Sequence, residues 1–443
     1  MSSKPTKLPL AELLELIIDH RGKTPNKLGF DDFFSTGVPV LSAKHVKTDV
    51  LVDVGSMRYA SPEMYKKWMT VEVREGDIIL TSEAPMGEVF YINDDQKYLL
   101  SQRVFGLRPN PRLVNPRYLA AWLASSEGQN QIAARASGST VQGIRQSELL
   151  KLEVDLPSEE EQERIANIRF SVADKINLNL RINQTLEAMA QAIFKSWFVD
   201  FDPVKARIAA IQASRDPLRA AMSAISGKAD AELDALPREQ FDQLAATAAL
   251  FPDEMEESDL GEIPKGWKVH RVGNVLELVY GKALKSTDRQ EGDVPVYGSG
   301  GITGYHKTPL VQHGSIIVGR KGTVGSLYWE DEPFFPIDTT YYVRPLAAPL
   351  TFCYYAMQTL GLKKMNTDAA VPGLNRENVY RLELALPDSP ALQKFDVDVL
   401  TLRKAMRANS DLNKALVNLR DTLLPKLLSG ELSLTEGVAG ADA

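Results

Sequence analysis

Apolar residues recur at steps of three and four in two stretches of the chain, at 158–201 and again 230 residues later. The first stripe comprises Ile165, Val172, Ile176, Ile182, Leu186, Met189 and Ile193. The second comprises Phe395, Leu402, Met406, Leu412, Leu416, Leu419 and Leu423. Such steps place apolar side chains along one face of a helix, and a fixed period of this length indicates a duplicated module. The sequence therefore predicts two globular pieces, each followed by a long helix.

The two predicted helices also have recognisable starts. Leu156-Pro157-Ser158 is followed by Glu161, which is the spacing of a capping box. Leu386-Pro387-Asp388-Ser389 is followed by Pro390. Proline is tolerated in the first turn of a helix, because its missing N–H would have no partner there.

The globular pieces repeat each other as well. In the first piece, alternating apolar residues predict strands at Asp77 to Thr81 and Glu88 to Ile92, and helical spacing predicts a helix at Pro116 to Leu123. In the second piece, Gly314 to Val318 corresponds to the first of these strands and Gly325 to Trp329 to the second. The intervening segments differ in length and composition, so we expect two domains that share a frame and differ in their loops.

These patterns divide the chain into six segments. They are a first globular domain (1–157), a first long helix (158–202), an Ala-rich acidic linker (203–263), a second globular domain (264–388), a second long helix (389–430) and a disordered tail (431–443). We expect Gly430 to end the second helix. The linker is predicted to contain short helices and to be mobile in part.

The net charge of −7 is unevenly distributed along the chain. Residues 158–202 carry −3 and residues 203–263 carry −6, whereas both globular pieces are neutral or slightly basic. A local basic face on either globular piece is therefore compatible with the overall acidity. This distribution permits binding to a polyanion but does not argue for it.

Several patterns associated with catalysis or cofactors are incomplete. Gly22-Lys23-Thr24 resembles the end of a phosphate-binding loop, but Ile17 stands where that loop needs glycine. Glu332-Pro333-Phe334-Phe335 departs at its first and third positions from the Asn/Asp-Pro-Pro-aromatic motif of amino-methyltransferases. The five histidines lack metal-ligand spacing. His20 and His45 could belong to a site, but isolated surface histidines are the more common case.

The bulk composition is that of an ordinary soluble protein. No apolar run reaches the roughly 18 residues that a membrane span needs, and the N-terminal residues lack the apolar core of a signal peptide. Cys353 is the only cysteine, so no intrachain disulfide is possible. This favours a reducing, cytoplasmic location without a membrane partner.

Five short motifs occur in a characteristic order along the chain. They are Asp19-His20-Arg21-Gly22-Lys23-Thr24-Pro25, Phe198-Val199-Asp200-Phe201-Asp202-Pro203-Val204, Gly261-Glu262-Ile263-Pro264-Lys265-Gly266-Trp267, Gly319-Arg320-Lys321-Gly322-Thr323-Val324-Gly325 and Leu427-Leu428-Ser429-Gly430-Glu431-Leu432. With the two-module layout, they resemble the specificity (S) subunits of type I restriction–modification systems over nearly the whole chain.

The resemblance implies an α/β (α+β) fold with two duplicated target recognition domains, joined by two long antiparallel coiled-coil helices with pseudo-twofold symmetry. Each domain would read one half of a split double-stranded DNA target, and the helices would set the spacer between the halves. The implied partners are two modification (methyltransferase) subunits, which bind S-adenosylmethionine, and restriction (translocase/endonuclease) subunits, which use ATP and Mg. The chain itself is expected to have neither catalytic activity nor a cofactor and to act in phage defence.

Helix length supports this layout independently of the resemblance. A helix of about 40 residues spans roughly 60 Å, which is enough to hold two readers about 34–36 Å, one turn of DNA, apart. A coiled-coil adaptor with duplicated protein-binding domains is the alternative from another class, and a catalytic DNA enzyme is a third, disfavoured by the incomplete motifs. DNA binding that strengthens as the salt concentration falls would separate a DNA reader from an adaptor.

Basic and hydrogen-bonding side chains in glycine-rich loops can approach phosphates and base edges. The candidate DNA contacts are Arg21, Lys23, Lys44 and Arg103 in the first domain, and Lys282, Tyr297, Arg320 and Lys321 in the second. Solvated surface charge is the alternative interpretation of each. Arg320-Lys321, placed between two glycines, is the best candidate.

One polar residue interrupts each apolar stripe, Asn179 in the first and Asn409 in the second. The steps around each asparagine read the same in both directions, and each lies near the middle of its helix. Two antiparallel helices related by a pseudo-twofold axis would cross that axis at their midpoints. We therefore predict that Asn179 and Asn409 face each other and set the register of the helix pair; the alternative is that both point to solvent.

Overall fold

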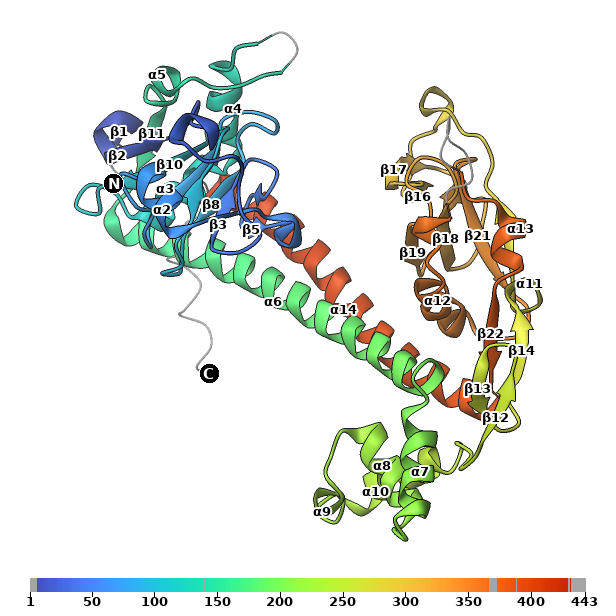
Figure 1. The fold of residues 1–443 in the computed structure, drawn as a ribbon. Helices are drawn as coiled ribbons and strands as arrows, with labels where there is room; N and C mark the ends of the chain where they lie inside the picture. Colours follow the sequence, from blue (N-terminus) through green and yellow to red (C-terminus); the bar gives the residue numbers. More distant parts are fainter. Residues whose placement is uncertain (1–5, 139–140, 366–372, 388, 429–430, 432–443) are drawn as a thin grey trace, which may run out of the picture. The chain divides into compact units, whose positions relative to one another are not determined.

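The computed structural model describes residues 6–138, 141–365, 373–387, 389–428 and 431. Two compact units make up the chain, Met1–Arg181 with Asn409–Ala443, and Ile182–Ala408. Each unit contains one globular domain and part of each long helix (Figure 1). The predicted Gly430 helix end and all but the first residue of the predicted disordered tail lie outside the described residues.

The first unit is built on an antiparallel sheet that is buried on both faces. Its strand order is β2 (Leu14–Asp19), β10 (Val104–Pro109), β7 (Ile78–Thr81) and β8 (Val89–Tyr91). Along β7, Ile78 and Leu80 pack into one core while Ile79 packs into the other, because successive side chains of a strand point to opposite faces. The predicted strands at 77–81 and 88–92 and the predicted helix, α3 (Pro116–Leu123), are confirmed.

Smaller elements cover the two faces of this sheet. They are β1 (Thr6–Pro9) paired with β11 (Glu153–Leu156), the sheet β6 (Tyr59–Ala60), β3 (Val38–Leu41) and β9 (Leu99–Leu100), the hairpin β4 (Val46–Lys47) and β5 (Val50–Leu51), and the helices α1 (Leu10–Leu13), α2 (Pro62–Trp68), α4 (Ser126–Ala134) and α5 (Gln146–Leu149). In the second sheet β3 pairs parallel to β9 and antiparallel to β6.

The second unit repeats this topology. Its main sheet has the order β15 (Leu276–Tyr280), β21 (Thr340–Pro345), β18 (Ser315–Gly319) and β19 (Leu327–Glu330), and its second sheet has the order β17 (Gly301–His306), β16 (Val294–Gly298) and β20 (Phe335–Pro336). The other elements are β14 (Lys268–Arg271) paired with β22 (Glu383–Leu386), and the helices α11 (Val272–Val275), α12 (Leu350–Thr359) and α13 (Arg376–Tyr380). β16 pairs parallel to β20, as β3 does to β9. The predicted duplication is thus confirmed strand by strand.

Two long helices, α6 (Glu159–Phe198) and α14 (Ser389–Leu428), run side by side (Figure 1). In the second unit Asn183 donates to the Met406 carbonyl at 3.0 Å, and Glu187 lies 3.6 Å from Arg403. Residue numbers therefore rise along α6 as they fall along α14, which makes the pair antiparallel, as predicted.

The predicted apolar stripe is only partly buried. Ile165 is fully enclosed in the first unit. Leu419 in the first unit and Met189 in the second are each 47% exposed. Part of each stripe is therefore on the surface of the pair.

The two predicted register residues are not hydrogen-bond partners. Asn179 is 1% exposed and its Nδ2 donates to Oδ1 of Asn413 at 2.7 Å, rather than to Asn409. Asn413 in turn donates to the Ile176 carbonyl at 3.4 Å. The prediction of an asparagine pair in the contact between the helices was right for Asn179, but its hydrogen-bond partner is Asn413 and not Asn409. Side chains of packed helices interdigitate, so a residue can meet a side chain one turn away from the position that symmetry relates to it.

We expect Asn413→Leu to lower the free energy of unfolding by about 1–3 kcal/mol, because it leaves the buried Asn179 amide without its partner. The double variant Asn179→Leu, Asn413→Leu should recover most of this loss, since both partners of the hydrogen bond are then apolar. Urea unfolding of the two variants measures the difference. A double variant that is as unstable as two independent losses would contradict this account of the pair.

Aromatic rings attach the end of α6 to the second globular domain. The Phe198 ring lies 5.1 Å from Phe395, 5.2 Å from Phe352 and 5.9 Å from Trp267, between ring centroids. Phe201, in the turn after the helix, lies 5.6 Å from the same Trp267 in an edge-on arrangement. Such aromatic pairs add to the stability that burial provides. Two motifs of the sequence, 198–204 and 261–267, thus meet in one core.

The segment predicted as a linker is more structured than that name implies. It contains α7 (Asp202–Gln212), α8 (Pro217–Ser226), α9 (Asp230–Leu233), α10 (Arg238–Ala248) and the hairpin β12 (Met255–Ser258) and β13 (Gly261–Pro264). Ala221, Met222, Leu233 and Ala248 form a small core of their own. The Asp216 carboxylate caps α8 by accepting from the Leu218 and Arg219 N–H groups. Small residues allow these short helices to pack closely.

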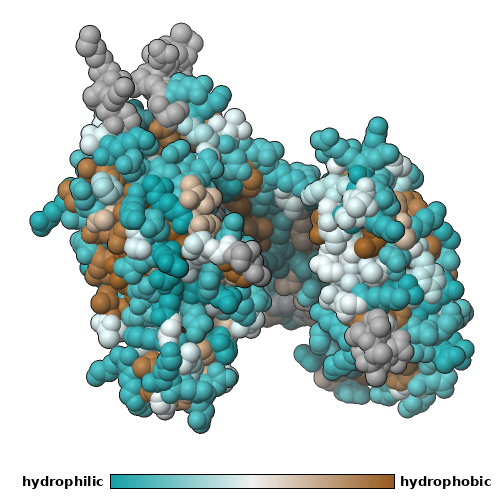
Figure 2. All heavy atoms as spheres, turned by 90° about the horizontal axis from the view of Figure 1, so that it is seen from above, coloured by the Kyte–Doolittle hydropathy of each residue, from teal (hydrophilic) through white to brown (hydrophobic). Residues whose placement is uncertain are grey.

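The surface gives no sign of a bilayer segment in the described part of the chain. None of the described helices combines the length and hydrophobicity that crossing a membrane requires. Figure 2 shows hydrophilic residues over most of the face of each unit that it displays, with hydrophobic residues in scattered patches. Among the same residues, no group of three or more His, Cys, Asp or Glu side chains is arranged to hold a metal ion.

Candidate nucleic-acid interface

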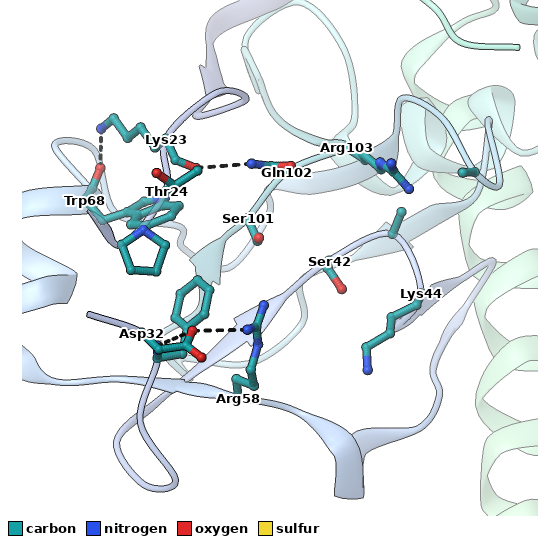
Figure 3. A pocket seen from close by; sticks show the side chains of 14 residues that line it. Lys23, Thr24, Asp32, Ser42, Lys44, Arg58, Trp68, Ser101, Gln102 and Arg103 are labelled. Atoms are coloured by element: carbon teal, nitrogen blue, oxygen red, sulfur yellow. Dashed lines mark hydrogen bonds and ion pairs between the residues drawn. The ribbon is translucent and has the colours of Figure 1, made fainter. Parts of the chain in front are cut away.

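A cleft of about 430 Å³ opens in the first unit, lined by the loops that follow β2, β3, β7 and β9 and by the segment before β6 (Figure 3). It lies at one end of the main sheet, beyond the C-terminal end of β2. Trp68 of α2 and Phe33 also line it. Four basic side chains from four separate segments line it, Lys23, Lys44, Arg58 and Arg103. The sequence predicted three of these as DNA contacts, and the fold brings all three to one cleft.

Lys23 reaches the cleft from the loop after β2. Its Nζ donates to the Trp68 carbonyl at 2.5 Å, and its own carbonyl accepts from Gln102 at 3.5 Å (Figure 3). Partial burial lowers the pKa of Lys23, since the charged form loses solvation. Its ammonium group is therefore held in place rather than extended into solvent.

The other three cations form exchangeable surface pairs. Lys44 lies 3.7 Å from Asp53, Arg58 lies 3.2 Å from Asp32, and Arg103 lies 3.1 Å from Glu83. Each of these side chains is more than half exposed. Exposed ion pairs of this kind are worth about 0–1 kcal/mol, so a phosphate group can replace the carboxylate at little cost.

Arg21, the fourth candidate in this domain, does not line the cleft. It forms a two-point ion pair with Asp19, at 2.9 and 2.8 Å, and stacks over the Phe105 ring at 4.0 Å. The guanidinium group is thus committed to the loop after β2. We assign it a role in shaping that loop.

His20 and His45 are buried, which corrects their interpretation as surface residues. They are 7% and 3% exposed, and burial lowers the pKa of both imidazoles. His45 Nδ1 lies 3.2 Å from the Ser42 hydroxyl, at the border of the cleft. Both histidines therefore support the loops from within.

The second unit presents corresponding loops at the end of its main sheet. The Arg320 carbonyl accepts from Leu374 N–H at 2.8 Å, as the Ser82 carbonyl accepts from Ile144 N–H at 2.9 Å. Arg320 Nη1 donates to the Asp338 carbonyl at 2.9 Å, and its guanidinium lies 4.9 Å from the centre of the Tyr280 ring. These contacts orient Arg320 along the loop, next to an exposed Lys321.

The two remaining candidates differ in accessibility. Lys282 is exposed in the loop after β15, where its N–H donates to the Pro336 carbonyl at 3.1 Å. Tyr297 is only 6% exposed, and its hydroxyl donates to Glu330 at 2.8 Å. Burial raises the pKa of Tyr297. Its selection as a DNA contact was wrong, because it occupies the core side of β16.

Arg58 and Gln102 are among the cleft residues that sequence reasoning missed. Gln102 adjoins the predicted Arg103, so its position next to a selected residue was an available signal. Arg58 carries no local signal, since it reaches the cleft only because the β6 strand that follows it pairs with β3. Such a long-range pairing is not encoded in the pattern around the residue itself.

Comparison with known proteins yields consistent matches. The sequence profile of the family described as "Type I restriction modification DNA specificity domain" matches residues 5–188 and 264–416. The HindI type I restriction enzyme specificity subunit of Haemophilus influenzae is 30% identical over 400 residues, covering 81% of this chain and 87% of the relative. The MjaIX specificity subunit of Methanocaldococcus jannaschii is 25% identical over 391 residues, covering 82% and 79%.

A solved structure resembles the fold as a whole. The S subunit of the type I restriction–modification system from M. genitalium covers 95% of this chain and is itself covered to 95%, with a TM-score of 0.53 and 18% identity. The family profile matches both globular domains and leaves residues 189–263 unmatched, which include the helices α7 to α10. The chain belongs to the family of type I restriction–modification specificity subunits.

Proposed function

We propose that this chain reads a bipartite double-stranded DNA target, with one half-site for the domain at 1–157 and the other for the domain at 264–388. The observation that carries the proposal is the repeated topology whose corresponding loops bear different basic residues. The first domain offers Lys44, Arg58 and Arg103, whereas the second offers Arg320 and Lys321. Two domains that share a topology but carry different side chains in their loops would be able to read two different base sequences.

The cleft of the first domain combines both kinds of group that DNA reading needs. Exposed lysine and arginine side chains attract phosphates, and this attraction positions a protein without selecting a sequence. Gln102 and Arg103 lie side by side at the cleft border, and the amide and guanidinium groups match adenine and guanine edges in the major groove. We assign base reading to these two residues and phosphate contacts to Lys44 and Arg58.

The helix pair is the proposed docking surface for two modification subunits. In the first unit Leu178, Leu412 and Leu419 are exposed on it, and in the second unit Met189 and Val397 are exposed. Exposed large apolar side chains on a helix surface favour contact with another protein. In this proposal the chain has no catalytic role of its own, and the partner subunits carry S-adenosylmethionine, ATP and Mg.

Methylation mapping in cells with and without the gene tests the proposal. We expect a two-part sequence with a fixed gap to be methylated only when the gene is present. The purified complex with modification subunits should bind that sequence more tightly as the salt concentration falls, since bound phosphates release counterions. An identical methylation pattern in both strains, with salt-independent binding, would contradict the proposal.

A further inference from the structure

The turn between β4 and β5, Thr48-Asp49, contacts both long helices at once. Asp49 Oδ1 lies 2.7 Å from Nη2 of Arg169 on α6, and Oδ2 lies 3.4 Å from Nη1 of Arg420 on α14. The Asp49 carbonyl also accepts from Asn177 of α6 at 3.0 Å. All these residues belong to the first unit. One carboxylate thus bridges two helices that are far apart in the sequence.

This bridge is buried and nearly self-contained. The Arg169 side chain is 2% exposed and that of Asp49 is 11% exposed. Arg420 also pairs with Asp421 on its own helix at 2.8 Å, so two arginines face two carboxylates. Removing one partner of a buried ion pair leaves the other charge without compensation. Arg169 therefore depends on Asp49 far more than an exposed arginine would.

The same turn is bound just as tightly to the recognition domain. Glu88 Oε2 accepts from both the N–H and the hydroxyl of Thr48, each at 2.8 Å, and Glu88 Oε1 accepts from Lys47 at 2.8 Å. The Asp49 N–H donates to the Val89 carbonyl at 3.1 Å. These hydrogen bonds attach the turn, together with Lys47 at the end of β4, to the start of β8.

The attachment points lie next to the cleft. Glu88 is the last residue of the β7–β8 loop, whose Ala84 lines the cleft, and Lys44, which also lines it, precedes β4 by two residues. The path from the cleft to the helix pair is therefore short and continuous. It runs from the loops through Glu88 and Thr48 to Asp49, and from there to one arginine on each helix.

We propose that the Thr48-Asp49 turn is the joint that orients the first reading cleft on the helix pair, with Asp49, Arg169 and Arg420 as its positioning residues. The inference rests on the proposed function. A carboxylate at a fixed point can pair with an arginine from each helix in one relative register only, because sliding either helix separates the two cations. The joint and the Asn179–Asn413 hydrogen bond therefore favour the same register.

Asp49→Asn is the most direct test. Asp49 has a φ of 69°, and asparagine adopts this left-handed conformation as aspartate does, so the variant changes the charge and keeps the turn. The complex of the full chain with modification subunits is assayed on DNA with the natural spacer and with spacers one base pair longer or shorter. We expect discrimination between spacers to fall roughly 2- to 30-fold, while the affinity for an isolated first half-site is unchanged.

Asp421→Asn is the matched control. This substitution removes the Asp421 carboxylate, which pairs with the same Arg420. That pair lies within α14 and includes no residue of the recognition domain, so spacer discrimination should remain as in the wild type. Arg420→Gln provides a second variant if Asp49→Asn does not fold, since Arg420 is 21% exposed and its loss leaves the pair between Arg169 and Asp49 intact. It should also weaken discrimination.

A failure of the proposed joint and a failure of the proposed bipartite reading would give different results in this assay. If the wild-type complex prefers one spacer and a folded Asp49→Asn complex prefers it equally, the joint does not orient the cleft. Equal loss in Asp421→Asn and Asp49→Asn would likewise overturn the inference, because the effect would then be one of charge alone. If the wild-type complex itself shows no preference among spacers, the proposed bipartite reading fails instead.

Discussion

Replacing residues 264–388 with the same segment of another member of the family should change one half of the methylated sequence and leave the other half unaltered, if the proposed bipartite reading holds. The reason is that the reading loops of this segment belong to a sheet and a core within the second unit. Sequence mapping of methylated bases in cells that carry the exchanged gene measures the outcome.

The reciprocal exchange of residues 1–157 is the matched control, and it should alter the opposite half. The chain exchanged at 264–388 keeps α6, α14 and the Asp49 contacts with Arg169 and Arg420, so the gap between its halves should stay constant. A change in both halves after a single exchange would refute independent reading. A change in neither half would remove the segment from target recognition altogether.

The double variant Arg320→Ala, Lys321→Ala should assemble with its partners but bind target DNA more weakly. Arg320 is oriented by the Asp338 carbonyl and the Tyr280 ring, and Lys321 is exposed beside it. If both contact phosphates, the slope of log affinity against log salt concentration should become shallower by about two. Binding titrations across a range of salt concentrations measure that slope.

Lys268→Ala, Arg271→Ala is the matched control for this variant. These two exposed cations lie on β14, at the opposite end of the same domain from β16 and β17 in Figure 1. The control removes the same charge from the same unit, so it reveals any effect of net charge alone. If both variants have the same salt slope as the wild type, the loop after β18 does not contact phosphates.

The elements that sequence reasoning identified best are those with long or repeated patterns. The sequences of α6 and α14 contain many apolar residues spaced three and four apart, so the helical pattern is recognisable even where single positions depart from it. The strands β7 and β18 were identified because each repeats the other as well as its own apolar run. Lys23, Lys44 and Arg103 were selected as basic residues in loops, and the fold brings all three to one cleft, while their role as DNA contacts stays a prediction.

The errors concern quantities that depend on side-chain packing in three dimensions. Whether Tyr297 faces the core or the surface depends on the alternation along β16, and the register shift in its pairing with β17 obscures that alternation. The partner of Asn179 depends on how two helices interdigitate, which symmetry alone does not specify. The helices between 203 and 248 are short and Ala-rich, and their small core forms only when several of them pack together, so it was not evident from any one segment.

The first unit is discontinuous in sequence, and this has a consequence for its synthesis on the ribosome. Its main core includes Leu424 and Leu427, near the end of α14, together with Ile165 at the beginning of α6. The second unit is a single stretch, Ile182–Ala408, which leaves the ribosome earlier than those two leucines. The domain that is translated first is therefore the last to complete its core, and a premature stop codon before Leu424 should destabilise the domain encoded at the beginning of the gene.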